Sequence, residues 1–205
     1  MSETSNNIPL PEHKEGSKKD FESEVTTHNI EEAKKLYATA KERLLNVNQW
    51  HSICGKLSAV FQLANEAGEH IDDVAKKGYH FKIDILGPGS TSGEGYDWVQ
   101  VEDVQEAKDD SDDSEYILMT VRPTDNPAVE DENVAHFFSN KATSNFVVKR
   151  EGTKVIAAIY GRNEVPNTST GNIIDKARNA IIGASALAGG SNPQWKSLAD
   201  GLLGK

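Results

Sequence analysis

The feature that most constrains this fold is a two-residue period in the apolar side chains of the central part of the chain. Residues 57–63 place Leu57, Ala59, Phe61 and Leu63 at alternate positions, which predicts a strand with one buried face. Five similar segments follow, separated by polar loops, at 79–85, 96–104, 116–122, 143–149 and 154–162. A weaker alternation at 21–27 indicates a first strand. Successive strands of this kind predict a curved antiparallel sheet of about seven strands.

A helical pattern interrupts the strands after residue 27. Asn29 and Glu32 have the spacing of a capping box, which predicts a helix beginning at residue 30. Its apolar positions recur at helical spacing and are Ala33, Tyr37, Ala40 and Leu44. Val47, Trp50 and Ile53 indicate a second, short helix before Gly55. The first strand is therefore expected to precede two short helices.

The C-terminal part returns to helical spacing. Asn172 and Asp175 are a second capping pair, and an alanine-rich apolar face follows them up to a break at Gly189-Gly190. Pro193 then begins a second piece, because proline fits the first helical turn without losing a hydrogen bond. Its buried side is expected to be Trp195, Leu198, Ala199 and Leu202. We therefore expect an α+β domain in which the sheet wraps a long C-terminal helix.

Length and composition fit a single intracellular domain. The 205 residues suit one domain, for which we predict the range 20–205, preceded by a loose polar tail at 1–19. The net charge of −10 argues against nucleic acid and anionic membranes as partners. No secretory signal and no membrane-spanning stretch is found, so a cytoplasmic location is expected. A single cysteine, Cys54, excludes an internal disulfide.

This order of elements resembles the helix-grip fold of the START-like and polyketide-cyclase-like (SRPBCC) superfamily over residues 20–205. The segments 82–89, 96–99 and 161–164 are also similar to those of small uncharacterised bacterial proteins of this shape. The resemblance implies an apolar or amphipathic, lipid-like or polyketide-like ligand in a hydrophobic cavity between the sheet and the C-terminal helix. It carries over no catalytic residue. The pocket candidates are Trp50, His51, Phe61, Tyr79, Phe81, Trp98, Arg122 and Ile181.

Two alternatives to ligand binding stay open. One is an enzyme of the cyclase or aromatase type that uses pocket groups such as His51, Tyr79 or Arg122 as acid, base or anchor. The other is a structural or protein-interaction domain, in which aromatic side chains of the sheet fill the predicted cavity. The small alanine side chains of the C-terminal helix favour a cavity, because they leave space beside the sheet.

The remaining motifs predict neither a metal nor a cofactor. The glycine-rich loop 87–95 runs into a strand rather than a helix, so it is not a phosphate-binding loop; it is either a flap over the cavity or an ordinary connection. The acidic run 109–115 lacks the spacing of a calcium loop. No two of the six histidines have zinc-ligand spacing, although His51 and His136 lie in apolar company.

Overall fold

The computed structural model describes residues 8–53, 59–85, 90–129, 134–168, 175–176, 179–180, 182–183 and 192–205. Seven strands form one antiparallel sheet in the order β1-β7-β6-β5-β4-β3-β2. The strands are β1 (Ser17–Thr26), β2 (Ala59–Ala64), β3 (His80–Ile85), β4 (Asp97–Asp109), β5 (Ser114–Pro123), β6 (Thr143–Glu151) and β7 (Lys154–Glu164). Each strand after β2 pairs with the one before it, so hairpin pairing builds most of the sheet.

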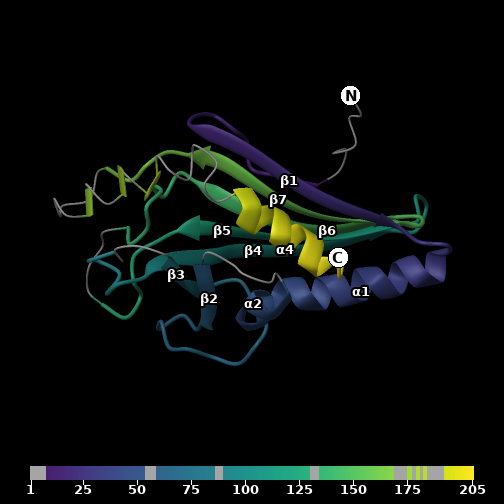
Figure 1. The fold of residues 1–205 in the computed structure, drawn as a ribbon, viewed down its shortest axis with the longest axis horizontal. Helices are drawn as coiled ribbons and strands as arrows, with labels where there is room; N and C mark the ends of the chain where they lie inside the picture. The colour runs from purple at the N-terminus through teal and green to yellow at the C-terminus, as the bar shows by residue number, and fades with distance from the viewer. Residues whose placement is uncertain are drawn as a thin grey trace.

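The helices lie on the inner face of the curled sheet (Figure 1). Helix α1 (Ile30–Leu45) contacts β6 and β7, and α4 (Asn192–Leu202) contacts β1 and β7. A 3₁₀ turn, η1 (Val47–Gln49), leads into the short α2 (Trp50–Ile53). A curled antiparallel sheet with helices on its inner face is consistent with the predicted helix-grip fold.

The predicted start of α1 is confirmed. The side chain of Asn29 accepts a hydrogen bond of 2.9 Å from the backbone N–H of Glu32, and the Glu32 carboxylate accepts one of 3.2 Å from the N–H of His28. These bonds satisfy backbone donors that have no partner within the helix. The apolar positions expected to be buried are buried, namely Ala33, Tyr37, Ala40 and Leu44.

The long C-terminal helix is not confirmed. The described helix α4 has 11 residues, beginning at Asn192 with Pro193 in its first turn, and it buries Leu198, Ala199 and Leu202 as expected. Residues 175–176, 179–180 and 182–183 are helical, but most of the stretch between Asn172 and Gly190 lies outside the described residues. None of the described helices is long and apolar enough to cross a membrane.

Several boundaries differ from those expected. Strand β4 continues to Asp109, past the predicted end at residue 104, because the polar residues 105–109 pair with 114–118 of β5 despite their lack of apolar alternation. A β-bulge between Val101 and Asp103 shifts the register within this strand. The pattern at 134–138 suggested one helical turn, but the structure has a bend at 136–137 and an isolated bridge between Phe138 and Pro166.

The central strands are buried on both faces. The main core takes their inner side chains, including Met119, Phe146 and Ile159. On the outer face, Leu118, Val147, Ala158 and Tyr160 form a second cluster, against which Ile8 and Leu10 pack. Strand β1 begins at Ser17, before the predicted Phe21, and residues 12–15 are hydrogen-bonded to Asn163. The division into a tail and a single domain at 20–205 stays a prediction.

Candidate binding groove beside helix α1

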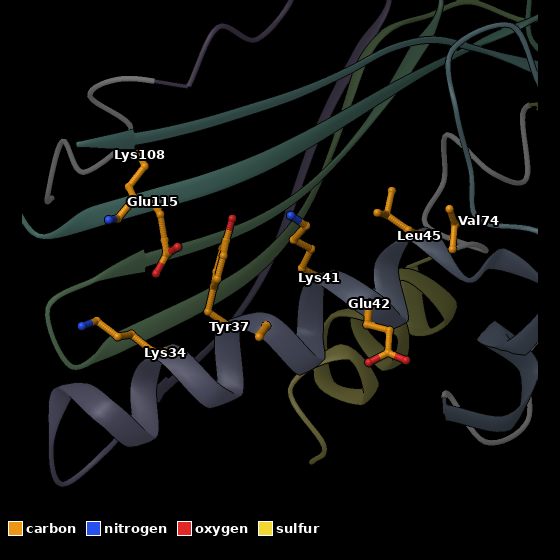
Figure 2. A pocket seen from close by; sticks show the side chains of 9 residues that line it. Lys34, Tyr37, Lys41, Glu42, Leu45, Val74, Lys108 and Glu115 are labelled. Carbon is orange, nitrogen blue, oxygen red and sulfur yellow. The ribbon is translucent and has the colours of Figure 1, made fainter. Parts of the chain in front are cut away.

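Helix α1 covers the inner face over β6 and β7 but leaves a groove between itself and the β4–β5 hairpin. The groove has a volume of about 620 Å³. Its lining residues are Lys34, Tyr37, Ala38, Lys41, Glu42, Leu45, Val74, Lys108 and Glu115. Figure 2 shows Tyr37 and Lys41 pointing from α1 toward the strands that carry Lys108 and Glu115, with Leu45 and Val74 at the other end. The groove therefore combines an apolar wall with a charged mouth.

The hydroxyl of Tyr37 is the central polar group of this groove. Only 7% of the residue is exposed, and it lines the groove together with Lys34 and Lys41 of the same helix. Burial raises the pKa of Tyr37, and the negative charges of Glu115 and Glu106 raise it further. The phenol therefore remains protonated at neutral pH and presents an O–H donor inside the groove.

Three lysines surround the groove, each with an acidic partner. Lys41 forms an ion pair with Glu106 across the space between α1 and β4. Lys34 lies 3.4 Å from Glu31, and Lys108 lies 2.5 Å from Asp110. The pairs of Lys34 and Lys108 are largely exposed, so they hold their lysines weakly and leave them able to turn toward a bound anion.

A buried arginine fixes Glu115, one of the two glutamates that line the groove. The side chain of Arg150 is fully buried and donates to Glu115 at 2.6 Å, to Asp113 at 3.0 Å and to the carbonyl of Gly152 at 2.9 Å. A buried guanidinium requires such partners, because an unpaired charge is costly to bury. Its hydrogen bond lowers the pKa of the Asp113 carboxyl. Glu115 is thus held in place, and its charge is balanced, at the end of the groove.

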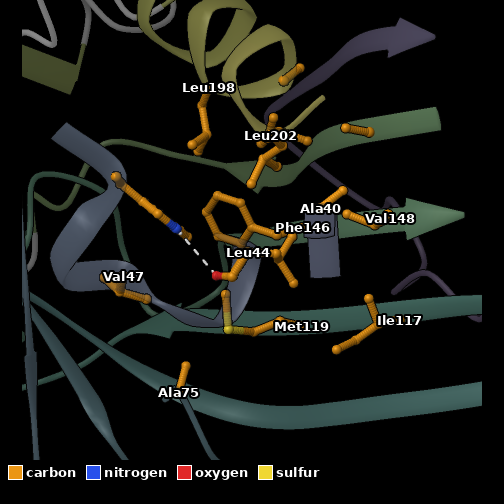
Figure 3. Close-up of a cluster of buried hydrophobic side chains, with 14 of the residues drawn as sticks. Ala40, Leu44, Val47, Ala75, Ile117, Met119, Phe146, Val148, Leu198 and Leu202 are labelled. Atoms are coloured by element: carbon orange, nitrogen blue, oxygen red, sulfur yellow. Dashed lines mark hydrogen bonds between the residues drawn. The ribbon is translucent and has the colours of Figure 1, made fainter. Parts of the chain in front are cut away.

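Of the predicted pocket residues, Trp50, Phe61 and Phe81 come together. The ring centroid of Trp50 lies 5.3 Å from that of Phe61, 5.7 Å from that of Phe81 and 5.0 Å from that of Phe146. Trp195 of α4 closes the group, 5.8 Å from Phe146. Figure 3 shows Leu198 and Leu202 of α4 pointing toward Phe146. Around Trp50, packed aromatic rings therefore occupy the space between α4 and the sheet.

The other predicted pocket residues lie apart. Tyr79 packs at the edge of the main core, with its hydroxyl 3.3 Å from Asp73. Trp98 belongs to a separate cluster with Ala64 and Ala135. The remaining three do not join them: His51 is exposed, Arg122 is bound to Glu102 and to the carbonyl of Asn140, and Ile181 lies outside the described residues. A ligand-binding role for the predicted set stays a prediction.

Helical spacing predicted that Tyr37 lies on the buried face of α1, but it did not predict the groove. One line of residues along α1 could have indicated the groove, because it follows helical spacing beside the fully apolar face. It consists of Lys34, Tyr37 or Ala38, Lys41 and Leu45. That row mixes long cationic and apolar side chains, as expected for a helix face that borders a solvent-filled space. The hairpin residues Lys108 and Glu115 fell within a segment predicted to be mostly loop.

The loop and histidine motifs have structural partners. The backbone N–H groups of Thr91 and Ser92 donate to the carboxylate of Asp175 at 2.7 and 3.1 Å, so this part of the 87–95 loop is tied to the C-terminal segment. In the buried His136, Nδ1 accepts from the N–H of Phe138 at 2.9 Å. Within the described ranges, no three histidine, cysteine or acidic side chains gather as metal ligands.

Comparison with known proteins gives no family. No family model and no curated protein matches the chain. Among solved structures, the protein described as Ara h 8.0201 matches over 92% of this chain and all of its own, with 11% identity and a TM-score of 0.33. A truncated norcoclaurine synthase from Thalictrum flavum matches over 90% and 92%, with 9% identity and a TM-score of 0.36. A major latex-like protein from Panax ginseng matches over 84% and 96%, with 13% identity and a TM-score of 0.34.

These TM-scores are below 0.5, so the matches assign neither a fold nor a function to this chain. The fold described above rests on the order of the strands and on the placement of the helices. The function has to be argued from the groove itself.

Proposed function

We propose that this protein binds an amphipathic small molecule in the groove between α1 and the β4–β5 hairpin. The observation that carries the proposal is the Tyr37 hydroxyl, an O–H donor that lines the groove on a residue of which only 7% is exposed. The apolar part of the ligand would lie against Ala38, Leu45 and Val74. An acceptor oxygen of the ligand would take the hydrogen bond of Tyr37. This site lies beside α1, whereas the sequence analysis expected one beside the C-terminal helix.

Size and charge support a ligand of this class. A volume of about 620 Å³ falls within the range of roughly 300–1,000 Å³ that is typical of small-molecule sites. A hydrogen bond between the Tyr37 hydroxyl and a ligand acceptor contributes about 0.5–1.5 kcal/mol net. The residues that line the groove include three lysines and two glutamates, and one of the glutamates, Glu115, is paired with Arg150, so an anionic head group fits better than a cationic one.

The first test compares decanoate, 1-decanol and decylammonium by isothermal titration calorimetry. We expect decanoate to bind most tightly, because the groove offers lysines and a hydroxyl donor. Tyr37→Phe keeps the ring and removes the hydroxyl, so the decanoate Kd should rise roughly 2- to 10-fold, the worth of one hydrogen bond. Tyr79→Phe is the matched control, because it removes a hydroxyl that lies outside the groove, and it should leave the Kd unchanged.

Two results would contradict the proposal. One is a decanoate Kd that is equal in wild type and Tyr37→Phe while both proteins have the same circular dichroism spectrum. The other is tighter binding of decylammonium than of decanoate, which would show that the acidic groups make the electrostatic potential of the groove negative.

A second function is favoured by the packed rings around Trp50. If the interior is a filled core throughout, the chain would serve as a structural or protein-interaction domain, the alternative left open by the sequence. That function predicts no heat of binding with any of the three probes. The cyclase or aromatase alternative gains no support from the described residues, since Arg122 lies on the outer face of β5 and Tyr79 packs against the inner core.

A further inference from the structure

The groove between α1 and the β4–β5 hairpin, the α1 groove, differs in chemistry between its two ends. Figure 2 shows Lys34, Lys108 and Glu115 at one end, and Leu45 and Val74 at the other. The first end lies beside the turn of the hairpin, and the second lies where helix α1 ends. Charged and apolar groups are therefore separated along the groove, so a matching ligand has a polar head and an apolar tail.

The charged end of the α1 groove suits a carboxylate. The acidic partners of Lys34 and Lys108 are Glu31 and Asp110, whose side chains are 78% and 84% exposed. Water screens such pairs, so a bound anion can replace these partners at little cost. Tyr37 lies one helical turn after Lys34 and adds a hydroxyl donor. A carboxylate has two acceptor oxygens and can use a lysine and this hydroxyl together.

The apolar end of the α1 groove is bordered by a segment that is fixed to the helix. The backbone N–H of Ala75 donates to the carbonyl of Leu45 at 2.8 Å, and Ala75 is buried in the main core. On the other side of Val74, the Asp73 carboxylate accepts from the Val74 N–H at 2.8 Å and lies 2.7 Å from Lys76. These contacts hold Val74 beside the last residue of α1, where it ends the groove.

The distance between the two ends limits the length of the tail. Tyr37 and Leu45 are eight residues apart in α1, which corresponds to about 12 Å along the helix axis. Carbon–carbon bonds of about 1.5 Å in an extended zigzag cover that distance with roughly ten carbons. A tail of this length would lie along Ala38 and Leu45, and a longer tail would meet Val74.

We propose that the ligand of the α1 groove is an unbranched carboxylate of about ten carbons, with its head at the hairpin and its tail against Val74. Val74 is then the residue that sets the maximum chain length. This inference rests on the function proposed above, to which it adds the class of ligand, its orientation and a residue that determines specificity.

Calorimetry with hexanoate, octanoate, decanoate, dodecanoate and tetradecanoate, each below its micellar concentration, tests the length limit. In wild type, the Kd should fall roughly 3- to 15-fold for each two methylenes added up to decanoate, because each buried methylene contributes to affinity. From decanoate to tetradecanoate the Kd should change less than about 2-fold, because the added carbons lie beyond the groove.

Substitutions of Val74 test whether it sets this limit. Val74→Trp shortens the groove, so the Kd of decanoate should rise roughly 5- to 20-fold while that of hexanoate changes less than about 2-fold. Val74→Ala opens the end, so dodecanoate should bind roughly 2- to 5-fold more tightly than decanoate. Val60→Trp and Val60→Ala are the matched controls, because Val60 of β2 is also exposed but does not line the groove. They should leave every Kd unchanged.

The double variant Lys34→Gln and Lys108→Gln tests the orientation of the ligand. It should raise the Kd of every alkanoate by the same factor, roughly 2- to 10-fold, and leave the length limit at decanoate. The matched control is Lys154→Gln with Lys196→Gln, two exposed, ion-paired lysines outside the groove.

The inference is overturned if affinity keeps rising to tetradecanoate in wild type, if Val74→Trp weakens hexanoate and decanoate alike, or if the lysine double variant binds as wild type does. Tyr37→Phe separates these failures from that of the proposed function. If decanoate binding depends on Tyr37 but shows no length limit, the groove still binds an amphipathic ligand and only this inference fails. If no alkanoate binds, both fail.

Discussion

Three buried polar side chains, Arg150, Tyr37 and Glu164, show how different the environments of single residues are in this protein. The side chain of Arg150 is completely buried and has three hydrogen-bond partners. Because its donors at these contacts are paired, its burial contributes to the stability of the hairpin. Tyr37 and Glu164 are almost as deeply buried, but the Tyr37 hydroxyl lines the α1 groove, and Glu164 keeps a buried Oε2 without a partner among the described residues.

Burial raises the pKa of Glu164, which gives a prediction for stability against pH. The native protein holds this proton to higher pH than the unfolded chain, whose carboxyl titrates near 4.5. The stability contributed by the protonated form is complete below that pH and is lost as pH rises through the native pKa. Urea denaturation from pH 4 to pH 8 should therefore show Glu164→Gln gaining stability relative to wild type as pH increases. A stability difference that stays constant over this range would contradict the assignment.

At the residue scale, the sequence predicted which side chains are apolar and buried but not which polar ones join them. Phe81 and Ile83 are buried as the alternation of β3 indicated. His80, on the opposite face, was expected to meet solvent, yet it is buried beneath Trp98 and lies 3.2 Å from the carbonyl of Asn65. Its burial lowers the pKa of His80. Those partners come from a loop and a neighbouring strand, so no periodicity within β3 reveals them.

Helix α1 is the element whose origin in the sequence is clearest. Its N-terminal cap, its acidic first turn of Glu31 and Glu32, and Arg43 in its last turn all agree with the helix dipole. It also carries one wall of the proposed groove. Its stability therefore affects both the fold and the candidate site.

Removal of the cap of α1 should destabilise the protein by a defined amount. Asn29→Ala loses the 2.9 Å hydrogen bond to the Glu32 N–H, so we expect a loss of about 1 kcal/mol in the free energy of unfolding. Asn46→Ala, at the other end of the helix, is the control, because Asn46 acts there through its backbone N–H. Urea denaturation of both variants measures the difference. Equal stabilities would show that the cap contributes nothing.

At the element scale, agreement between sequence and structure follows the strength of the apolar pattern. The hairpin of β6 and β7 was predicted from alternation and from Glu151-Gly152, and Gly152 takes the positive φ of 56° that the turn requires. The extension of β4 was missed because its last five residues are polar and are held by pairing alone. The final helical piece was predicted from Pro193, whereas the long helix before it is not confirmed.

At the scale of the whole molecule, the outer face of the sheet is also partly covered by the chain. An antiparallel sheet with one buried face would expose Leu118, Val147 and Ala158, but here residues 8–10 cover them. Asn163 fixes this segment through bonds to the backbone N–H of Lys14 at 2.7 Å and of Glu15 at 3.2 Å, and to the carbonyl of Glu12 at 3.0 Å.

Uncovering the outer face should weaken the fold and promote association. The double variant Ile8→Ser and Leu10→Ser removes two partly buried apolar side chains, which should cost about 2 kcal/mol in total. The exposed cluster should then drive self-association, visible by sedimentation velocity. Ile30→Ser is the control, because Ile30 is already 42% exposed and covers no other cluster. If the double variant stays monomeric and its stability is unchanged, residues 8–10 do not stabilise the sheet.

The pairing of β1 with β7 also has a consequence for the order of events in folding. The two strands meet where Thr27 and Thr153 are hydrogen-bonded, 126 positions apart in the chain. Every other neighbouring pair in the sheet is consecutive in sequence. On the ribosome, β1 therefore emerges long before its partner is made, and five strands are complete before the seventh can accept the first. The entropy lost in closing so long a loop is compensated only at the final step, so the sheet gains its full width last.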